Sequence, residues 1–178
     1  MNIKEIIKEF KQIKSKLVVT DTNTDFFIQS DIIQLHKGLN ELLRKDLISN
    51  GLFLDAGCGD GRVIAITTLL GIPSIGVEYD NELANIAREK IKKLNLNAII
   101  KQGNFTNDKV YEEIGGFNKI KTVFNYFSGT ELIAEKITKN QTFILYTTQK
   151  EAYPLRLEHI TTIELNKTTP TYLHVYKK

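Results

Sequence analysis

The chain has few of the residues from which disulfides and metal sites are built. Cys58 is its one cysteine among 178 residues, which excludes an internal disulfide and a cysteine-rich zinc site. No stretch approaches the ~20 apolar residues that a membrane-spanning helix needs. We therefore expect a cytoplasmic protein that neither enters a membrane nor holds a resident metal.

The chain also lacks a large excess of either positive or negative charge. The 24 Lys and Arg residues stand against 21 Asp and Glu, a formal net charge of +3, which permits contact with RNA without requiring it. The run Lys90 to Lys93 is interpreted as a solvated helix face rather than an RNA-binding patch. His36, His159 and His174 occur singly, which favours surface or packing roles over that of a general base.

The first fifty residues show helical periodicity. Apolar residues at three- and four-residue steps predict a helix from Ile3 to about Leu17. After a polar break at 19–25, a second helix is predicted, capped by Ser30 and ended by Asn50-Gly51. Two N-terminal helices should therefore precede the first strand.

From Leu52 onward, short apolar runs alternate with helical segments. Strands are predicted at 52–57, 74–78, 97–103, 121–127 and 142–148, and helices at about 62–70, 81–94, 108–114 and 130–138. This alternation is typical of a parallel sheet covered by helices. The last segments, 157–165 and 171–178, flank a short turn and predict an antiparallel hairpin, whereas an NAD-binding fold normally finishes with a sixth parallel strand.

Together these elements predict the fold class and the domain. We expect an α/β protein with a Rossmann-like, doubly wound, seven-stranded sheet, mostly parallel but with an antiparallel C-terminal hairpin. The length fits a single domain over 1–178, with N-terminal helices in 1–50 and the core in 51–178.

The most informative motif is Asp-Ala-Gly-Cys-Gly-Asp-Gly at 55–61, between the first predicted strand and the helix that follows it. Gly57, Gly59 and Gly61 allow a tight turn and let a ligand approach the main chain closely. A dinucleotide-binding G-x-G-x-x-G that starts at Gly57 would need its last glycine at position 62, where the chain has Arg62. A pyrophosphate site is therefore disfavoured.

The pattern D-x-G-x-G-x-G resembles the first motif of class I methyltransferases, which use S-adenosylmethionine (SAM) and release S-adenosyl-L-homocysteine. This resemblance implies that Asp55, Gly57, Cys58, Gly59 and Gly61 contact SAM. An acidic residue at position 55 suits a cofactor that carries an α-amino group.

The ends of the second and third strands supply further candidates. Glu78 ends the second strand, where the resemblance implies hydrogen bonds to the ribose hydroxyls, and Tyr79 could border the adenine. Asn104 stands where the family usually has Asp, and its amide oxygen could accept a hydrogen bond from the adenine amino group. Phe105 offers a flat surface for the ring, although it could equally be core.

The fourth strand ends in Asn125 and Tyr126, which in this fold would face the transferable methyl group. Enzymes that methylate adenine or glutamine nitrogens commonly have prolines after the Asn, and their absence counts against those classes. The stretch from the glycine loop to the C-terminus is more similar to small archaeal and mitochondrial protein lysine methyltransferases. Asn125 and Tyr126 are then the catalytic candidates, which would orient the acceptor amine.

Three functions remain open from the sequence. The first is methylation of a protein lysine, the second is methylation of RNA or a small metabolite by the same fold, and the third is a non-catalytic scaffold that binds SAM. The oligomeric state is not predicted.

Overall fold

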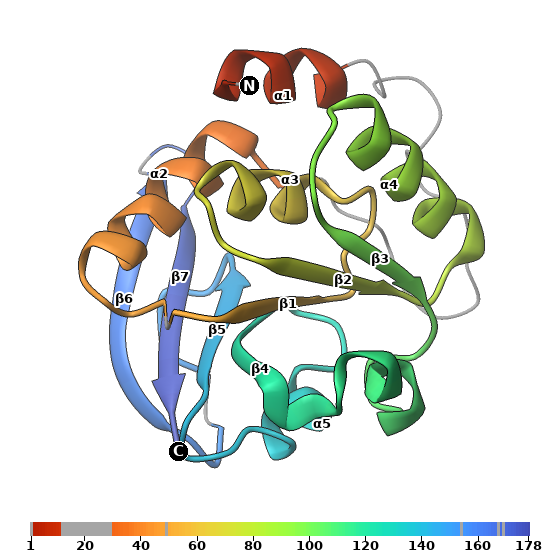
Figure 1. Ribbon diagram of the computed structural model, residues 1–178. Coiled ribbons are helices and arrows are strands. Elements are labelled where there is room, and N and C mark those ends of the chain that lie inside the picture. The colour runs from red at the N-terminus through yellow and green to blue at the C-terminus, as the bar shows by residue number, and fades with distance from the viewer. Residues whose placement is uncertain (1, 12–29, 49, 154, 167, 169) are drawn as a thin grey trace.

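The computed structural model describes residues 2–11, 30–48, 50–153, 155–166, 168 and 170–178, which form one seven-stranded sheet with helices on both faces (Figure 1). The strands are β1 (Leu52–Ala56), β2 (Ser74–Glu78), β3 (Ile99–Gln102), β4 (Ile120–Tyr126), β5 (Thr142–Thr147), β6 (Glu158–Asn166) and β7 (Thr171–Lys177). The helices are α1 (Ile3–Lys11), α2 (Ile32–Arg44), α3 (Arg62–Leu69), α4 (Asn81–Lys93) and α5 (Thr130–Glu135), with two 3₁₀ helices, η1 (Asp108–Ile114) and η2 (Phe117–Lys119). None of the helices in the described ranges is long and apolar enough to cross a membrane.

The strands lie in the order β3-β2-β1-β4-β5-β7-β6. Five of them pair in parallel, and β7 runs antiparallel to both β5 and β6. This topology confirms the predicted fold class. β1 and β4 are neighbours, but the chain continues from β1 to β2 on one side and from β4 to β5 on the other. The carboxyl ends of β1 and β4 therefore form a topological switch point, where open α/β sheets bind ligands.

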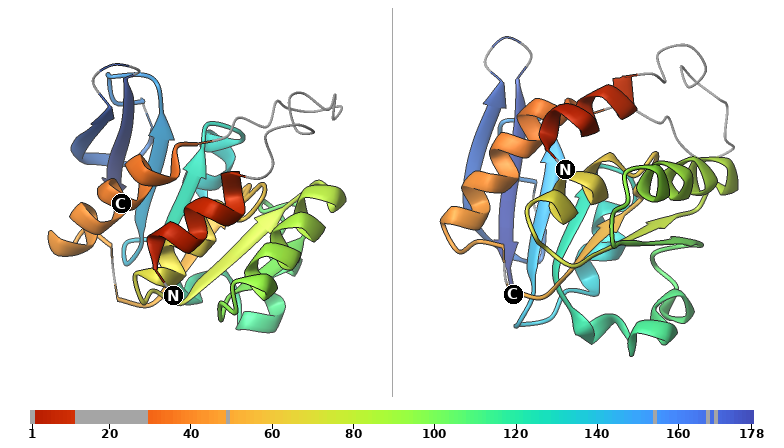
Figure 2. Two further views of the ribbon diagram at one scale, coloured as in Figure 1. Left: turned by 90° about the horizontal axis from the view of Figure 1, so that it is seen from above. Right: turned by 45° about the horizontal axis from the view of Figure 1, so that its top comes forward.

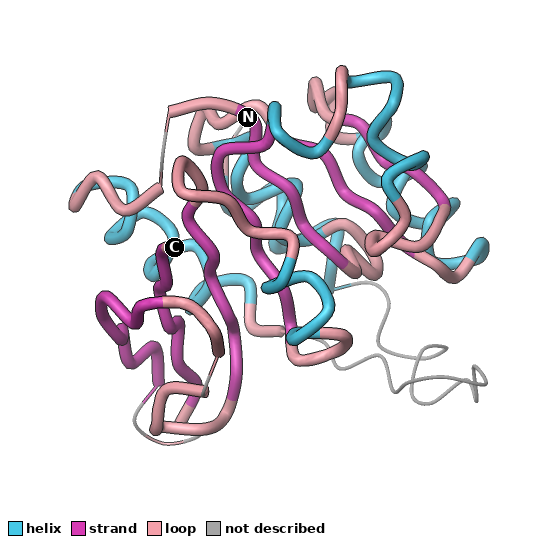
Figure 3. The backbone as a smooth tube through the Cα atoms, turned by 90° about the horizontal axis from the view of Figure 1, so that it is seen from below, coloured by secondary structure: helices cyan, strands magenta, loops and turns pink. Residues whose placement is uncertain are grey.

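Two cores flank the sheet. Helices α1 to α4 lie on one face, as both views of Figure 2 show, and their apolar residues pack with Phe53, Phe124 and Ile144 of the sheet. The opposite face, seen from below in Figure 3, is covered by α5 and η1 through Ile133 and Tyr111. The predicted doubly wound arrangement is therefore present.

Some predicted element boundaries were wrong. The cap of α2 is Asp31 rather than Ser30, because its Oδ1 accepts hydrogen bonds from the amides of Ile33 (2.8 Å) and Gln34 (3.0 Å). This helix ends at Arg44, well before Asn50-Gly51. The helix predicted at 108–114 is present with those bounds, and it is a 3₁₀ helix. The predicted extension of the first helix to Leu17 and the polar break at 19–25 lie outside the described residues.

The C-terminal hairpin forms as predicted and carries helix α2 on one face. The register of β6 on β7 shifts between His159 and Thr161 and again between Glu164 and Asn166. At Gly38 of α2, a Cβ atom would lie 2.7 Å from Cδ1 of Leu173, so glycine allows the helix to sit directly on the hairpin. The neighbouring Leu39 is fully buried.

This packing predicts that α2 is an integral part of the fold. The substitution Leu39→Ala should lower the free energy of unfolding by about 2–5 kcal/mol, because it leaves a cavity in the core. The control Ile33→Ala, on the exposed side of the same helix, should cost about 1 kcal/mol or less. Urea denaturation would measure both, and equal losses would show that α2 is not packed as described.

Candidate functional site

The glycine loop forms a tight turn between β1 and α3. Gly57, Gly59 and Gly61 have φ angles of 87°, 52° and 82°, in the left-handed region that side chains disfavour. The amides of Gly57 and Cys58 both donate to the carbonyl of Val77, at 2.9 and 3.1 Å. The predicted role of these glycines in shaping a close-approach turn is thus consistent with their backbone geometry.

Glu78 joins the loop to the end of β2. Its Oε2 accepts a hydrogen bond from the Gly59 amide at 2.8 Å, and its Oε1 accepts one from the Asp80 amide at 2.9 Å. Burial raises the pKa of this carboxyl, although the backbone hydrogen bonds partly oppose the effect. Since a carboxylate has about four lone-pair sites, Glu78 retains the capacity to accept a hydrogen bond from a ligand hydroxyl.

Asp55 has a carboxylate oxygen that lacks a hydrogen-bond partner among the described residues. This oxygen is Oδ2, and the residue is 2% exposed. Burial and the nearby charges of Glu78 and Asp60 raise its pKa well above the usual 3.8. A buried carboxylate oxygen of this kind is costly unless something cationic or hydrogen-donating satisfies it.

Cys58 has a packing role in the loop. A Cβ at Gly76 would lie 2.7 Å from the Cys58 Sγ and 2.9 Å from its Cβ, so the cysteine fills the space above a glycine of β2. Burial, together with the charge of Asp55, raises the pKa of the thiol. The thiol therefore stays protonated at neutral pH and is a poor nucleophile.

The residues after β2 and β3 lie at the same end of the sheet. Tyr79 is 63% exposed, with its ring free to contact a ligand. The Oδ1 of Asn104 already accepts hydrogen bonds from the amide and hydroxyl of Thr106, both at 2.8 Å. The ring of Phe105 lies between two glycines: Cβ atoms at Gly57 and Gly129 would be 3.8 and 2.8 Å from it. Phe105 therefore connects the glycine loop with the segment after β4.

Asn125 has its side chain fully engaged within the protein. Its Nδ2 donates to the carbonyls of Ala56 and Ser128, each at 2.9 Å, and its Oδ1 accepts from the Thr130 hydroxyl at 2.9 Å. The residue is 1% exposed. It thus joins the end of β1 to the turn after β4, rather than offering a free amide to the surface.

Tyr126 faces the other side of the sheet from Asn125. Its ring packs edge-on against Tyr146, with centroids 4.7 Å apart, and joins the core beneath α1 to α3. Burial raises the pKa of its hydroxyl, and Tyr146 adds to the effect. Its partial exposure leaves part of the ring accessible at the end of the strand.

A cavity of about 350 Å³ opens beside this turn, and the sequence did not point to it. Its lining residues come from the turn, from α5 and from the segment after β5: Phe127, Gly129, Thr130, Glu131, Leu132 and Tyr153. The Tyr153 hydroxyl donates to the Glu131 carboxylate at 3.2 Å. Phe127 has a φ of 56°, unfavourable for an aromatic residue, and the residue is 53% exposed. Backbone strain that holds an aromatic ring at the surface is a feature of binding sites.

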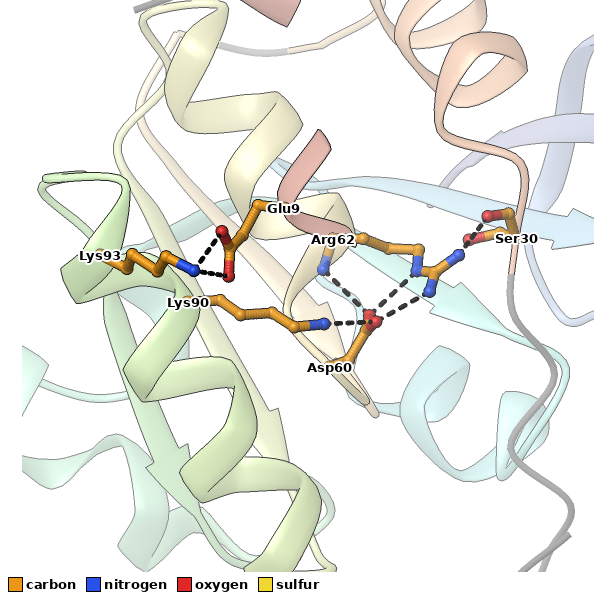
Figure 4. Close-up of polar contacts among 6 residues, drawn as sticks. All are labelled: Glu9, Ser30, Asp60, Arg62, Lys90 and Lys93. Carbon is orange, nitrogen blue, oxygen red and sulfur yellow. Dashed lines mark hydrogen bonds and ion pairs between the residues drawn. The ribbon is translucent and has the colours of Figure 1, made fainter. Parts of the chain in front are cut away.

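A second group that the sequence missed lies behind the glycine loop, where Asp60, Arg62 and Lys90 form a buried charged cluster (Figure 4). Lys90 is 5% exposed and Lys92 and Lys93 are exposed, so the prediction of a solvated Lys90–Lys93 face was wrong for Lys90. Lys90 faces the loop because Ala87, one turn earlier on α4, abuts Gly61.

His174, one of the three histidines, has hydrogen-bond partners within the protein. His174 is buried, with its ring nitrogens 2.9 Å from the Gln149 carbonyl and 2.7 Å from the Thr162 hydroxyl, as a packing role requires. Among the described residues, no group of three or more His, Cys, Asp or Glu side chains is arranged to hold a metal ion.

Comparison with solved structures identifies the fold. A SAM-dependent methyltransferase from Clostridium acetobutylicum is 11% identical over 96% of this chain and 98% of its own, with a TM-score of 0.62. An RNA methyltransferase from Salinibacter ruber, in complex with S-adenosyl-L-homocysteine, is 17% identical over 85% of this chain and 93% of its own, with a TM-score of 0.59. The chain has the seven-stranded methyltransferase fold.

A third structure with this methyltransferase fold is larger. The Pyrococcus abyssi tRNA (uracil-54, C5)-methyltransferase, also in complex with S-adenosyl-L-homocysteine, is 14% identical over 85% of this chain and 39% of its own, with a TM-score of 0.63. No protein-family model matches the chain, and no curated protein sequence matches it.

The surroundings of Asp55 predict a pH dependence of stability. Because the native pKa is raised, protonated Asp55 stabilises the fold, and this stabilisation is present below 3.8 and lost as the pH rises through the native value. Asp55→Asn, which is neutral at every pH, should therefore gain stability relative to wild type as the pH rises, by about 1–3 kcal/mol at most. Chemical denaturation from pH 4 to 8 would measure the difference. Parallel curves for the two proteins would contradict the assignment.

Proposed function

We propose that the chain is a methyltransferase that binds SAM at the glycine loop. The observation that carries the proposal is the unpaired, buried Oδ2 of Asp55, at the start of a loop whose glycines leave the main chain open to a ligand. The α-amino group of SAM is a cation with hydrogens to donate, which is what this oxygen lacks. The shared fold supports the proposal, since two of the similar structures contain S-adenosyl-L-homocysteine.

The remaining loop and strand-end residues would hold the nucleoside. Glu78 would accept hydrogen bonds from the ribose hydroxyls while it continues to anchor Gly59. Tyr79 and Phe105 would line the adenine from two strand ends. Asn104 would contribute an oxygen to the adenine amino group only by exchanging a hydrogen bond with Thr106.

The cavity beside the turn after β4 is the proposed acceptor site. When bound, SAM supplies a methyl group on a positively charged sulfur, which a nucleophile aligned with the sulfur–carbon bond can displace. Phe127 and Tyr153 give aromatic walls, Glu131 a carboxylate, and none of the six lining residues is basic. Aromatic faces and a carboxylate attract an ammonium group, whereas a phosphate or carboxylate would find no cation there.

The lining of the cavity therefore favours an amine as the acceptor, and we expect that amine to be a protein lysine. The amine must lose its proton before transfer, and the apolar walls of Phe127 and Leu132 favour the neutral form by desolvation. The exposed Glu131 carboxylate can take that proton and release it to water. Asn125 would act by positioning the turn that carries Phe127. Tyr126 does not line the cavity, so it could contact only a part of the acceptor that extends past the end of β4.

The cofactor site is tested by substitutions in the loop and at β2. Gly59→Arg and Asp55→Ala should abolish SAM binding, because one fills the loop and the other removes the partner of the amino group. Glu78→Ala should weaken SAM by about 1–3 kcal/mol through loss of hydrogen bonds to a charged group. Isothermal titration calorimetry would measure binding, with circular dichroism as the check on folding. Unchanged affinity in the first two variants would end the proposal.

The acceptor site is tested with a matched pair of glutamates on α5. Glu131 lines the cavity, whereas Glu135, in the next turn of the helix, is exposed and does not. Glu131→Gln should raise KM for an amine acceptor roughly tenfold, as expected for a lost charge-assisted contact, and Glu135→Gln should leave it unchanged. Equal effects of the two substitutions would place the acceptor elsewhere.

The class of acceptor is tested by transfer of radiolabelled methyl groups from SAM into separate pools of protein, RNA and small metabolites. Label in protein, found on lysine after hydrolysis, is the expected result. Label in RNA or in a metabolite would replace the lysine proposal and keep methyl transfer. SAM binding without any labelled product would favour a scaffold role.

A further inference from the structure

Asp60 fixes the back of the glycine loop. It lies between Gly59 and Gly61, is fully buried, and accepts hydrogen bonds from Arg62 Nε (2.9 Å) and Nη2 (2.8 Å) and from Lys90 Nζ (2.9 Å). The two cations outweigh the effect of burial and lower the pKa of this carboxyl, so it stays ionised at neutral pH. The loop is thus held by Glu78 on one side and by Asp60 on the other.

The cluster joins the loop to two other parts of the chain. Arg62 Nη1 donates to the Ser30 carbonyl at 2.6 Å, next to the cap of α2 (Figure 4). Lys90 comes from the face of α4 that also holds Ala87, and a Cβ at Gly61 would be 3.0 Å from the Ala87 Cβ. The loop therefore has little freedom to move away from α4.

Helix α1 closes this cluster from above. The ring of the buried Phe10 lies 4.2 Å from the Lys90 ammonium and 5.9 Å from the Arg62 guanidinium carbon, in the range of cation–π contacts. The adjacent Glu9 pairs with Lys93 of α4 at 2.8 Å (Figure 4). The first helix thus contacts both cations that hold Asp60.

The composition of the cluster indicates what it does. Removing charges from water is costly, and apolar residues usually stabilise a core at least as well as a buried ion pair. Here one carboxylate is buried with two cations, so one positive charge is left beneath the ring of Phe10. What directed hydrogen bonds provide, and apolar packing does not, is a fixed orientation of the loop main chain.

We propose that α1 helps to hold the glycine loop in the shape that binds the cofactor, with Phe10, Lys90 and Asp60 as positioning residues. The inference rests on the proposed function, because the loop they hold is the one assigned to the amino-acid end of SAM. Docking of α1 and occupancy of the loop then strengthen each other, since coupling between two sites is reciprocal. The cluster contacts the loop through Asp60, whereas Tyr79 and Phe105 follow β2 and β3 and would hold the nucleoside.

The test compares two ligands in the full-length protein. S-adenosyl-L-homocysteine has the amino-acid end, and 5′-methylthioadenosine lacks it. Lys90→Met keeps a side chain of similar length but removes the cation, and Phe10→Leu keeps an apolar side chain, although a smaller one, but removes the ring. Each should weaken S-adenosyl-L-homocysteine roughly tenfold, the scale of a lost contact to a charged group, with 5′-methylthioadenosine nearly unchanged. Lys45→Met, which breaks the exposed ion pair with Glu41 at the end of α2, is the control and should change neither.

A second measurement needs no variant. In the wild-type protein, S-adenosyl-L-homocysteine should slow amide hydrogen exchange in α1, and 5′-methylthioadenosine should slow it less. Two results would overturn the inference while leaving the proposed function intact. One is a rate of amide exchange in α1 that S-adenosyl-L-homocysteine does not change, and the other is an equal loss of affinity for both ligands in the Lys90→Met and Phe10→Leu variants. If the wild type binds neither S-adenosyl-L-homocysteine nor SAM, the proposed function fails and this inference fails with it.

Discussion

The hydrogen bond from the Gly59 amide to the Glu78 carboxylate is the interaction on which the site depends. It joins the first turn of the chain's α/β core to the end of the second strand, and it leaves Asp55 between two other acids with one oxygen unsatisfied. A loop built from three glycines has many conformations in the unfolded chain, so a defined shape in the native state requires such anchors. Glu78 and Asp60 supply them from opposite sides, and both are carboxylates placed where backbone amides or cations can meet them.

Much of the fold could be predicted because it depends on local patterns. The alternation of apolar runs and helical segments predicted the five parallel strands and the terminal hairpin, and the three glycines predicted the turn. Helix limits were less predictable: Ser30 was expected to cap α2, and the adjacent Asp31, also a favoured cap residue, forms the hydrogen bonds instead. The fold therefore follows from periodicity, whereas its boundaries follow from single hydrogen bonds.

The site was less predictable, because its members come from distant parts of the chain. Nothing local to Lys90 shows that it meets Asp60, thirty residues earlier in sequence, and its neighbours Lys92 and Lys93 are exposed. Similarly, Asn125 was singled out for its place at a strand end, but the structure engages its amide with Ala56, Ser128 and Thr130. The exposed ring of Phe127 depends on a left-handed backbone, which a Tyr-Phe-Ser sequence does not suggest.

The two register shifts of β6 affect whether this edge of the sheet can pair with another chain. This strand is the outermost on its side of the sheet, and the edge of a sheet is where a foreign strand can add. Register shifts twist such a border, and the exposed charges of Glu158 and Glu164 add repulsion between copies. At the opposite border, β3 is only four residues long and carries Lys101. Both edges of the sheet thus carry features that oppose strand-to-strand growth between copies of the chain.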